Sequence, residues 1–175
     1  MQHYGAVQLT LGIGSQPRGM PSTMTHGVLS FDWGMTVIGI LEVDSGTYTA
    51  YRYENMAEGA NRLISSTGTI VSFNGNGRDL IEIAKILGFS SEAEMNISGE
   101  HNDMMEITSD IRWPPNPGSA SILGPSLLET YRHYFGDIAP IPPEGLRDNY
   151  LISNWKDCYM TAELWKKWRR GELVA

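Results

Sequence analysis

Hydrophobic residues in the first half of the chain follow the short runs and the two-residue alternation typical of β-strands. Three such segments come close together: VLSFDWG at 28–34, TVIGILEVD at 36–44 and TYTAYRYE at 47–54, with a Ser45-Gly46 turn between the last two. Tight turns between neighbouring strands predict an antiparallel meander. The apolar run GTIVSFN at 68–74 predicts a further, buried strand.

Helical spacing of apolar residues dominates the rest of the chain. The predicted helices cover 55–65, 78–89, 90–96, a segment within 97–111 that contains Asp103, 126–136 and 148–173, with Gly88 and Gly136 as stops. Pro/Gly-rich loops are predicted at 113–125 and 138–145. Strands that come first and then alternate with helices predict an α/β fold, with a mixed sheet of about five strands flanked by helices.

The domain organisation follows from composition. Residues 1–27 are rich in Gly and Pro and predict a flexible N-terminal arm, in which only YGAVQLTLGI resembles a short strand. Residues 28–175 are long enough for a single domain with its own core. The N-terminus lacks a signal-peptide pattern, and no apolar run approaches the roughly 20 residues that cross a bilayer, so we expect no membrane contact. The single cysteine, Cys158, predicts a buried thiol in a reducing compartment, the cytoplasm.

The charge of the chain limits its possible partners. A formal net charge of −7 disfavours a high-affinity, sequence-reading DNA-binding protein, because such proteins gain much of their affinity by neutralising phosphates. It does not exclude a nuclease, because active-site carboxylates are themselves acidic.

Three aspartates lie where the pattern places a strand end or a helix. Asp32 follows an apolar strand, Asp79 opens a helix after a Gly-rich turn, and Asp157 lies inside the final helix. Three carboxylates brought together bind hard cations such as Mg²⁺ or Mn²⁺ through oxygen. Taken singly, Asp79 also fits a helix cap and Asp157 a solvated helix position.

The sequence around these aspartates resembles that of a known nuclease family. FDWGM at 31–35, FNGNGRD at 73–79 and SNWKDCYMT at 153–161 are similar, in this order, to the motifs of the DEDD 3′–5′ exonucleases of the ribonuclease H-like superfamily, most closely the tyrosine branch; HNDMMEI at 101–107 resembles an element between the last two. The resemblance implies a ribonuclease H-like fold and a two-metal exonuclease acting on an end of single-stranded DNA or RNA. It implies that Asp32, Asp79 and Asp157 are the catalytic metal ligands and that Phe73 and Asn74 line the substrate cleft.

Two positions depart from the family pattern. Gly34 stands where the family has a metal-holding glutamate, and Ser153 stands where the tyrosine branch has its tyrosine. Glu82, Asp103 and Glu106 are candidate compensating acids, with solvated helix carboxylates as the alternative. If none compensates, we expect a weakened enzyme in which one cation position is filled. A further alternative is an inactive nuclease-fold module that binds nucleic acid or a protein partner.

Two more sequence features bear on function. DWGMTVIG at 32–39 also resembles the opening of the Holliday-junction resolvase branch (RuvC and YqgF proteins), which is the second alternative. WKKWRR at 165–170 predicts a substrate-binding patch formed by Lys166, Lys167, Arg169 and Arg170; the competing interpretation is that these cations complement the helix dipole. His101 is expected to be a loop histidine satisfied by the backbone.

Overall fold

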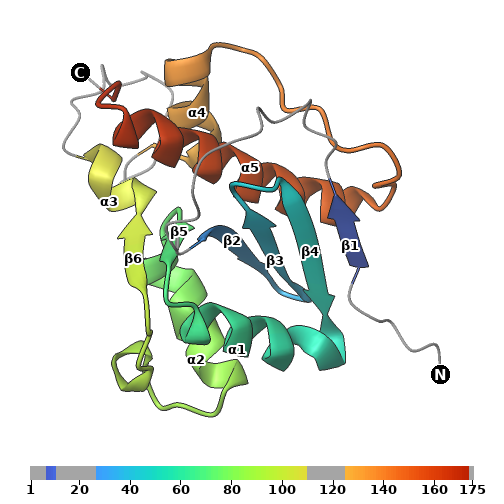
Figure 1. Ribbon diagram of the computed structural model, residues 1–175, viewed down its shortest axis with the longest axis vertical. Helices are drawn as coiled ribbons and strands as arrows, with labels where there is room; N and C mark the ends of the chain where they lie inside the picture. The colour runs from blue at the N-terminus through green and yellow to red at the C-terminus, as the bar shows by residue number, and fades with distance from the viewer. Residues whose placement is uncertain (1–6, 11–26, 110–124, 174–175) are drawn as a thin grey trace, which may run out of the picture.

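A central β-sheet forms the core of the computed structural model, which describes residues 7–10, 27–109 and 125–173 (Figure 1). The strands are β1 (Val7–Thr10), β2 (Val28–Gly34), β3 (Val37–Glu42), β4 (Thr47–Arg52), β5 (Thr69–Ser72) and β6 (Glu100–Asp103), in the spatial order β1-β4-β3-β2-β5-β6. The pairs β1–β4, β4–β3 and β3–β2 are antiparallel, whereas β2–β5 and β5–β6 are parallel. The predicted mixed sheet is therefore confirmed for β2 to β6.

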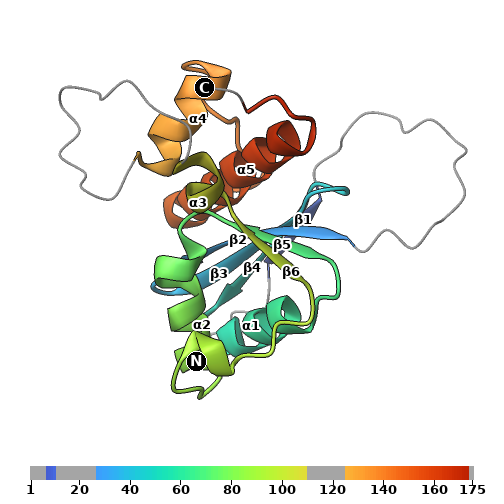
Figure 2. The same ribbon diagram turned by 90° about the vertical axis from the view of Figure 1, so that its left-hand side faces the viewer.

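Helices cover both faces of the sheet. They are α1 (Met56–Ser65), α2 (Leu80–Ile86), α3 (Met104–Ser109), α4 (Leu127–Phe135) and α5 (Asn149–Arg169), with short 3-10 turns η1 (Tyr53–Asn55) and η3 (Glu92–Glu94) and a π-type turn η2 (Gly75–Asp79). Figures 1 and 2 show α5 on one side of the sheet and α1 and α2 on the other. The predicted α/β class, with flanking helices, is confirmed.

Alternation along the strands sorts side chains between the two faces. Phe31 of β2 and Ile38 and Ile40 of β3 pack with α1 and α2, whereas Val37 and Leu41 of β3 pack with α5. Position 32 has the same parity as Ser30, whose hydroxyl donates to the backbone oxygen of Cys158 on α5 at 2.8 Å. Asp32 is thereby directed to the α5 face.

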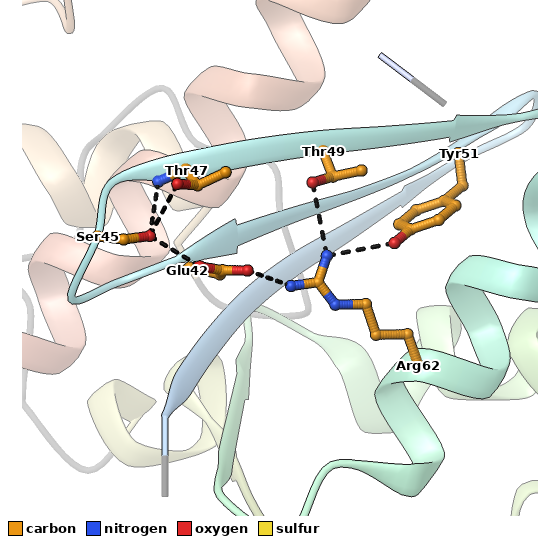
Figure 3. Close-up of polar contacts among 6 residues, drawn as sticks. All are labelled: Glu42, Ser45, Thr47, Thr49, Tyr51 and Arg62. Atoms are coloured by element: carbon orange, nitrogen blue, oxygen red, sulfur yellow. Dashed lines mark hydrogen bonds and ion pairs between the residues drawn. The ribbon is translucent and has the colours of Figure 1, made fainter. Parts of the chain in front are cut away.

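An ion pair and hydrogen bonds fix α1 on the opposite face. The guanidinium of Arg62 on α1 pairs with Glu42 of β3 and donates to the hydroxyls of Tyr51, at 3.2 Å, and Thr49, at 3.5 Å, on β4 (Figure 3). Ser45, in the predicted turn, donates to the Glu42 carboxylate at 2.8 Å. This cluster ties one helix to two strands and to the turn between them.

Three details go beyond the sequence-based expectation. Val7–Thr10, within the predicted arm, forms edge strand β1; the rest of the arm lies outside the described residues. The segment EHND at 100–103 is strand β6, because its backbone completes the parallel pairing with β5; Asp103, predicted inside a helix, is therefore the last residue of a strand, directly before α3. The predicted loop at 113–125 lies outside the described residues except for Pro125.

The helix predicted at 90–96 is wrong, because the segment forms only the 3-10 turn η3, whereas the other helix predictions hold. Helix α4 begins with a capping box formed by Ser126 and Glu129 and ends at Gly136. Gly88 has a φ of 81°, the left-handed conformation that suits a helix stop. In the described ranges, no helix has both the length and the apolar character that a membrane crossing requires.

Candidate active site

The first predicted ligand, Asp32, lies near the carboxyl end of β2 and is held by a residue from α5. The side-chain amide of Asn154 donates to Asp32 Oδ2 at 2.6 Å and to its backbone oxygen at 3.2 Å. Gly39, paired with Asp32 on β3, makes this contact possible, because a Cβ there would lie 1.7 Å from Asn154 Oδ1. The glycine thus lets the helix side chain reach the sheet.

A buried tyrosine fixes which way the Asn154 amide faces. The hydroxyl of Tyr48, on β4, donates to Asn154 Oδ1 at 2.6 Å, and both side chains are almost completely buried. Since the amide oxygen accepts from Tyr48, the amide nitrogen must face Asp32. The two successive hydrogen bonds, from Tyr48 to Asn154 and from Asn154 to Asp32, therefore hold the Asp32 carboxylate in place.

The second predicted ligand, Asp79, lies at the junction of η2 and α2. Its carboxylate is buried and accepts a hydrogen bond from the backbone N–H of Trp33, next to Asp32 on β2. Pairing between β2 and β5 ends at Ser30 and Val71, so the later part of β2 has a free edge toward η2. The strand ends therefore bring Asp32 and Asp79 to the same place.

The third predicted ligand, Asp157, lies on α5 one turn after Asn154. One turn of helix places the two side chains on the same face, which is the face that meets β2. Asp157 is half-buried and contributes to the electrostatic environment of Asp32. All three predicted ligands thus gather at one end of the sheet.

Burial raises the pKa of all three carboxyl groups, and repulsion from a neighbouring aspartate adds to the rise for Asp32 and Asp79. Burial and then the Asp157 charge raise the pKa of Asp32 to about 7, against the Asn154 hydrogen bond and the Arg78 charge. Burial and then the Asp32 charge raise the pKa of Asp79 to about 8, opposed first by Arg78. Burial raises the pKa of Asp157 to about 6, opposed by Lys156. Such raised values are typical of acid clusters that a bound cation would neutralise.

The donor chemistry fits a hard cation, but the carboxylates are not assembled around one. Across residues 7–10, 27–109 and 125–173, no group of three or more His, Cys, Asp or Glu side chains is arranged so that it could hold a metal ion. The three aspartates interact through their charges, so binding of Mg²⁺ or Mn²⁺ requires their side chains to close around the ion.

The candidate compensating acids have partners of their own. Both oxygens of buried Asp103 accept backbone N–H groups: Asn74 at 2.8 Å, Asn76 at 3.0 Å and Met105 at 3.0 Å. Asp103 therefore holds the turn before Asp79, and its charge adds a small contribution to the raised pKa of Asp79. Two further pairs complete the picture: Glu82 with Lys85 at 2.7 Å, and Glu106 with the Asn76 amide at 2.7 Å.

The predicted substrate-binding residues lie near the site or on the helix that carries Asp157. Phe73 packs against the cluster of Val71, Met104 and Leu164, and Asn74 adopts the left-handed conformation, with φ of 63°. His101, placed on β6 rather than in a loop, shares a hydrogen bond with the Ser72 hydroxyl at 2.8 Å, and burial lowers its pKa.

The basic segment at the end of α5 is largely neutralised. Lys166 pairs with Glu163 at 2.8 Å, and Glu172 pairs with Lys167 at 3.5 Å and Arg170 at 2.6 Å. Arg169 is exposed, and its guanidinium lies about 6 Å from the rings of Trp165 and Trp168. Among these four cations, Arg169 has the charge most available to a ligand.

Sequence reasoning missed four residues of the site: Tyr48, Arg78, Tyr150 and Asn154. Arg78 lies over the Trp33 ring at 5.6 Å, and its charge lowers the pKa of Asp32 and Asp79. Tyr150, Asn154 and Asp157 follow helical spacing, which signals one shared face of α5. Tyr48 carried no sequence signal, because only the fold brings β4 to α5.

Gly34, where the family pattern has an acid, lies at the end of β2 against Tyr150. Its φ is outside the left-handed region, so the backbone accepts a side chain. A Cβ at this position would lie 2.7 Å from the Tyr150 hydroxyl oxygen and 3.1 Å from a methyl group of Val37. The space that a residue 34 side chain would need is therefore partly filled by a tyrosine.

Three buried or half-buried aspartates, an amide that holds one of them and a neighbouring arginine thus define the candidate active site. Compared with models of known protein families, with curated proteins and with solved structures, the chain matches none of them.

Proposed function

We propose that this chain has a ribonuclease H-like fold and is a metal-dependent 3′–5′ exonuclease-like protein that acts on nucleic acid. The observation that carries the proposal is the meeting of Asp32, Asp79 and Asp157 from three separate elements, with the pKa of each raised. The mixed sheet, antiparallel on one side and parallel on the other, supports the fold assignment.

In this proposal the three aspartates hold Mg²⁺ or Mn²⁺, which when bound would stabilise the negative charge that develops on a phosphodiester. Asn154 keeps the Asp32 carboxylate in place through its 2.6 Å hydrogen bond, and Tyr48 keeps the amide in the required orientation. Arg78 lies beside the carboxylates without forming a close ion pair with them, so its guanidinium is free to bind a phosphate oxygen.

The proposed substrate is an end of a single-stranded DNA or RNA. Arg78 lies over the Trp33 ring next to Asp32 in the chain, and the Phe73-Asn74 segment directly precedes the turn that carries Asp79. Aromatic side chains with a nearby arginine are groups that bind unpaired bases and their phosphates. Arg169 and the rest of the 165–170 segment would contact the strand farther from the cleaved end. A cytoplasmic location stays a prediction from the single cysteine, which is buried.

An inactive binding module is the second candidate, and two observations favour it. Gly34 and Ser153 leave the site without two family side chains, and the three aspartates are not preassembled around an ion. In that case the same surface binds nucleic acid or a protein partner without cleaving it. The resolvase-like alternative rests on the DWGMTVIG segment alone.

The deciding experiment follows a 5′-labelled single strand of DNA or RNA with purified protein, in Mg²⁺ or Mn²⁺. We expect a ladder shortened from the 3′ end, with faster cleavage in Mn²⁺, because Mg²⁺ demands near-ideal octahedral geometry. Asp32→Asn, Asp79→Asn and Asp157→Asn should each reduce the rate roughly 100-fold or more, since each removes a charged metal ligand. Asp44→Asn, in the exposed β3–β4 turn, is the matched control.

The possible outcomes separate the candidates. Equal cleavage by wild type and all three variants would trace the activity to another nuclease. Bound cation without cleavage would favour the inactive module. Cleavage of a four-way junction, with single strands left intact, would favour the resolvase-like alternative.

A further inference from the structure

The Tyr150 hydroxyl occupies the space beside Gly34, the last residue of β2. Its oxygen lies 2.7 Å from the position of a Cβ on residue 34, and the tyrosine is 39% exposed, so a bound molecule can reach it. Tyr150 lies on the same face of α5 as Asn154, which binds Asp32, and Asp157. A neutral hydroxyl thus stands where an added acid would have faced the aspartates.

The position of Tyr150 is fixed by the first turn of α5. The Asp148 carboxylate caps the helix by accepting the backbone N–H groups of Tyr150, at 2.9 Å, and Leu151, at 3.3 Å. Its other oxygen pairs with Arg52 at the end of β4, at 3.1 Å. This clamp holds the start of α5 against the sheet, so the tyrosine is aimed at the end of β2.

These contacts limit how many cations the site can hold. Two closely spaced metal ions need several carboxylates between them. Here one oxygen of Asp32 is engaged by Asn154, Asp103 is engaged by three backbone N–H groups, and residue 34 supplies no oxygen. Asp79 also accepts the backbone N–H of Trp33, so the carboxylate oxygens left over would serve one divalent cation, once the three side chains close around it.

We infer that the site takes a single divalent cation and that the Tyr150 hydroxyl, in place of a second one, donates a hydrogen bond to a phosphate oxygen of the bound nucleotide. The inference rests on the proposed function and names how that site binds its ligand. A hydroxyl donor suits an anionic phosphate oxygen, because hydrogen bonds to charged acceptors are the stronger ones. No bond is made or broken in this step.

The first test counts bound Mn²⁺ by calorimetry and by electron paramagnetic resonance. We expect one Mn²⁺ per wild-type chain, and two in the double variant Gly34→Glu/Tyr150→Ala, which adds a carboxylate and removes the ring that blocks it. Two Mn²⁺ ions in the wild type would overturn the one-cation inference and leave the proposed function standing. No Mn²⁺ in the wild type would overturn the proposed function as well.

The second test measures binding of adenosine 5′-monophosphate in saturating Mn²⁺. Tyr150→Phe removes only the hydroxyl, so we expect roughly tenfold weaker nucleotide binding with unchanged Mn²⁺ affinity. Tyr159→Phe makes the same chemical change on α5 where the ring stacks on Trp155, and should leave nucleotide binding unchanged. Equal affinities in the two variants would overturn the role of Tyr150. This test decides by itself if the double variant does not fold.

Discussion

Replacing Asp32 by Asn should stabilise the metal-free protein, and more so at high pH. Burial and Asp157 raise the pKa of Asp32 from its ordinary value of 3.8 to about 7. Between these two values the folded protein retains a proton that the unfolded chain has released. The stability that the protonated Asp32 contributes to the folded state is therefore fully present below pH 3.8 and is lost as the pH rises through about 7. Asparagine at position 32 cannot ionise, and its side-chain oxygen can still accept the hydrogen bond that the Asn154 amide donates.

The size of the effect follows from the pKa change. One pKa unit corresponds to about 1.4 kcal/mol, so the rise from 3.8 to about 7 corresponds to about 4 kcal/mol at pH 8. Because Asp32 is half-buried, water screens part of this energy, and we expect a gain of about 2 kcal/mol. For a chain of 175 residues that gain raises the melting temperature by roughly 4–8 °C.

The assay is urea unfolding of wild type and Asp32→Asn in EDTA at pH 5 and pH 8. We expect the free energy of unfolding of the variant to exceed that of the wild type clearly at pH 8. The difference should be much smaller at pH 5, where Asp32 is largely protonated in the folded state. Asp44→Asn, at an exposed position, should change neither value. The same difference at both pH values, or a less stable variant at pH 8, would refute the assigned pKa.

Three further predictions concern metal, substrate and the turn before Asp79. Millimolar Mn²⁺ should raise the melting temperature of wild type and not of Asp32→Asn, because the unfolded chain has no preformed site; equal shifts would place the cation elsewhere. Replacing Lys166, Lys167, Arg169 and Arg170 by Ala should weaken single-strand binding and flatten its salt dependence. Arg169→Ala alone should cause more of this loss than Lys166→Ala, because the Lys166 cation already pairs with Glu163. Unchanged binding across a salt series would mean that these cations only complement the helix dipole. Asp103→Asn should lower the free energy of unfolding, measured in urea, by roughly 2–3 kcal/mol, because at least one backbone N–H loses its charged acceptor. The control Glu106→Gln should change this free energy little. Equal free energies for the two variants would contradict the role of Asp103 in the turn.

Periodic apolar segments predicted most elements of the fold. The meander, α1, α2, α4 and α5 could be predicted because each buries one face, and that requirement appears as spacing in the sequence. Strand β6 could not, since its residues Glu100–Asp103 are polar and its pairing with β5 is made by the backbone. Strand β1 was only hinted at for a similar reason, because a short edge strand needs little apolar character.

The candidate site could be predicted only as a set of aspartates. Their positions at a strand end and on two helices indicated chemistry, but the supporting contacts depend on tertiary packing. Tyr48 and Asn154 meet across the sheet, 106 positions apart in the sequence. The crowding of Gly34 by Tyr150 likewise needed the placement of α5 on the sheet.

The arrangement around Asp32 is costly for stability, and that cost is concentrated at one end of the sheet. Each of the three acids has its pKa raised, so each destabilises the folded, metal-free protein near neutral pH. An amide at position 32 would keep the Asn154 hydrogen bond without this penalty, whereas the buried Tyr48–Asn154 pair instead holds a charged group in place. Elsewhere in the described sheet most buried side chains are apolar, the buried carboxylate of Asp103 is satisfied by backbone N–H groups, and the surface charges of Arg52 and Arg62 are paired. The cluster of acids with raised pKa departs from this pattern, and residues from several elements hold it in place. A binding site for a cation and an anionic ligand requires such a cluster, whether or not the ligand is then cleaved.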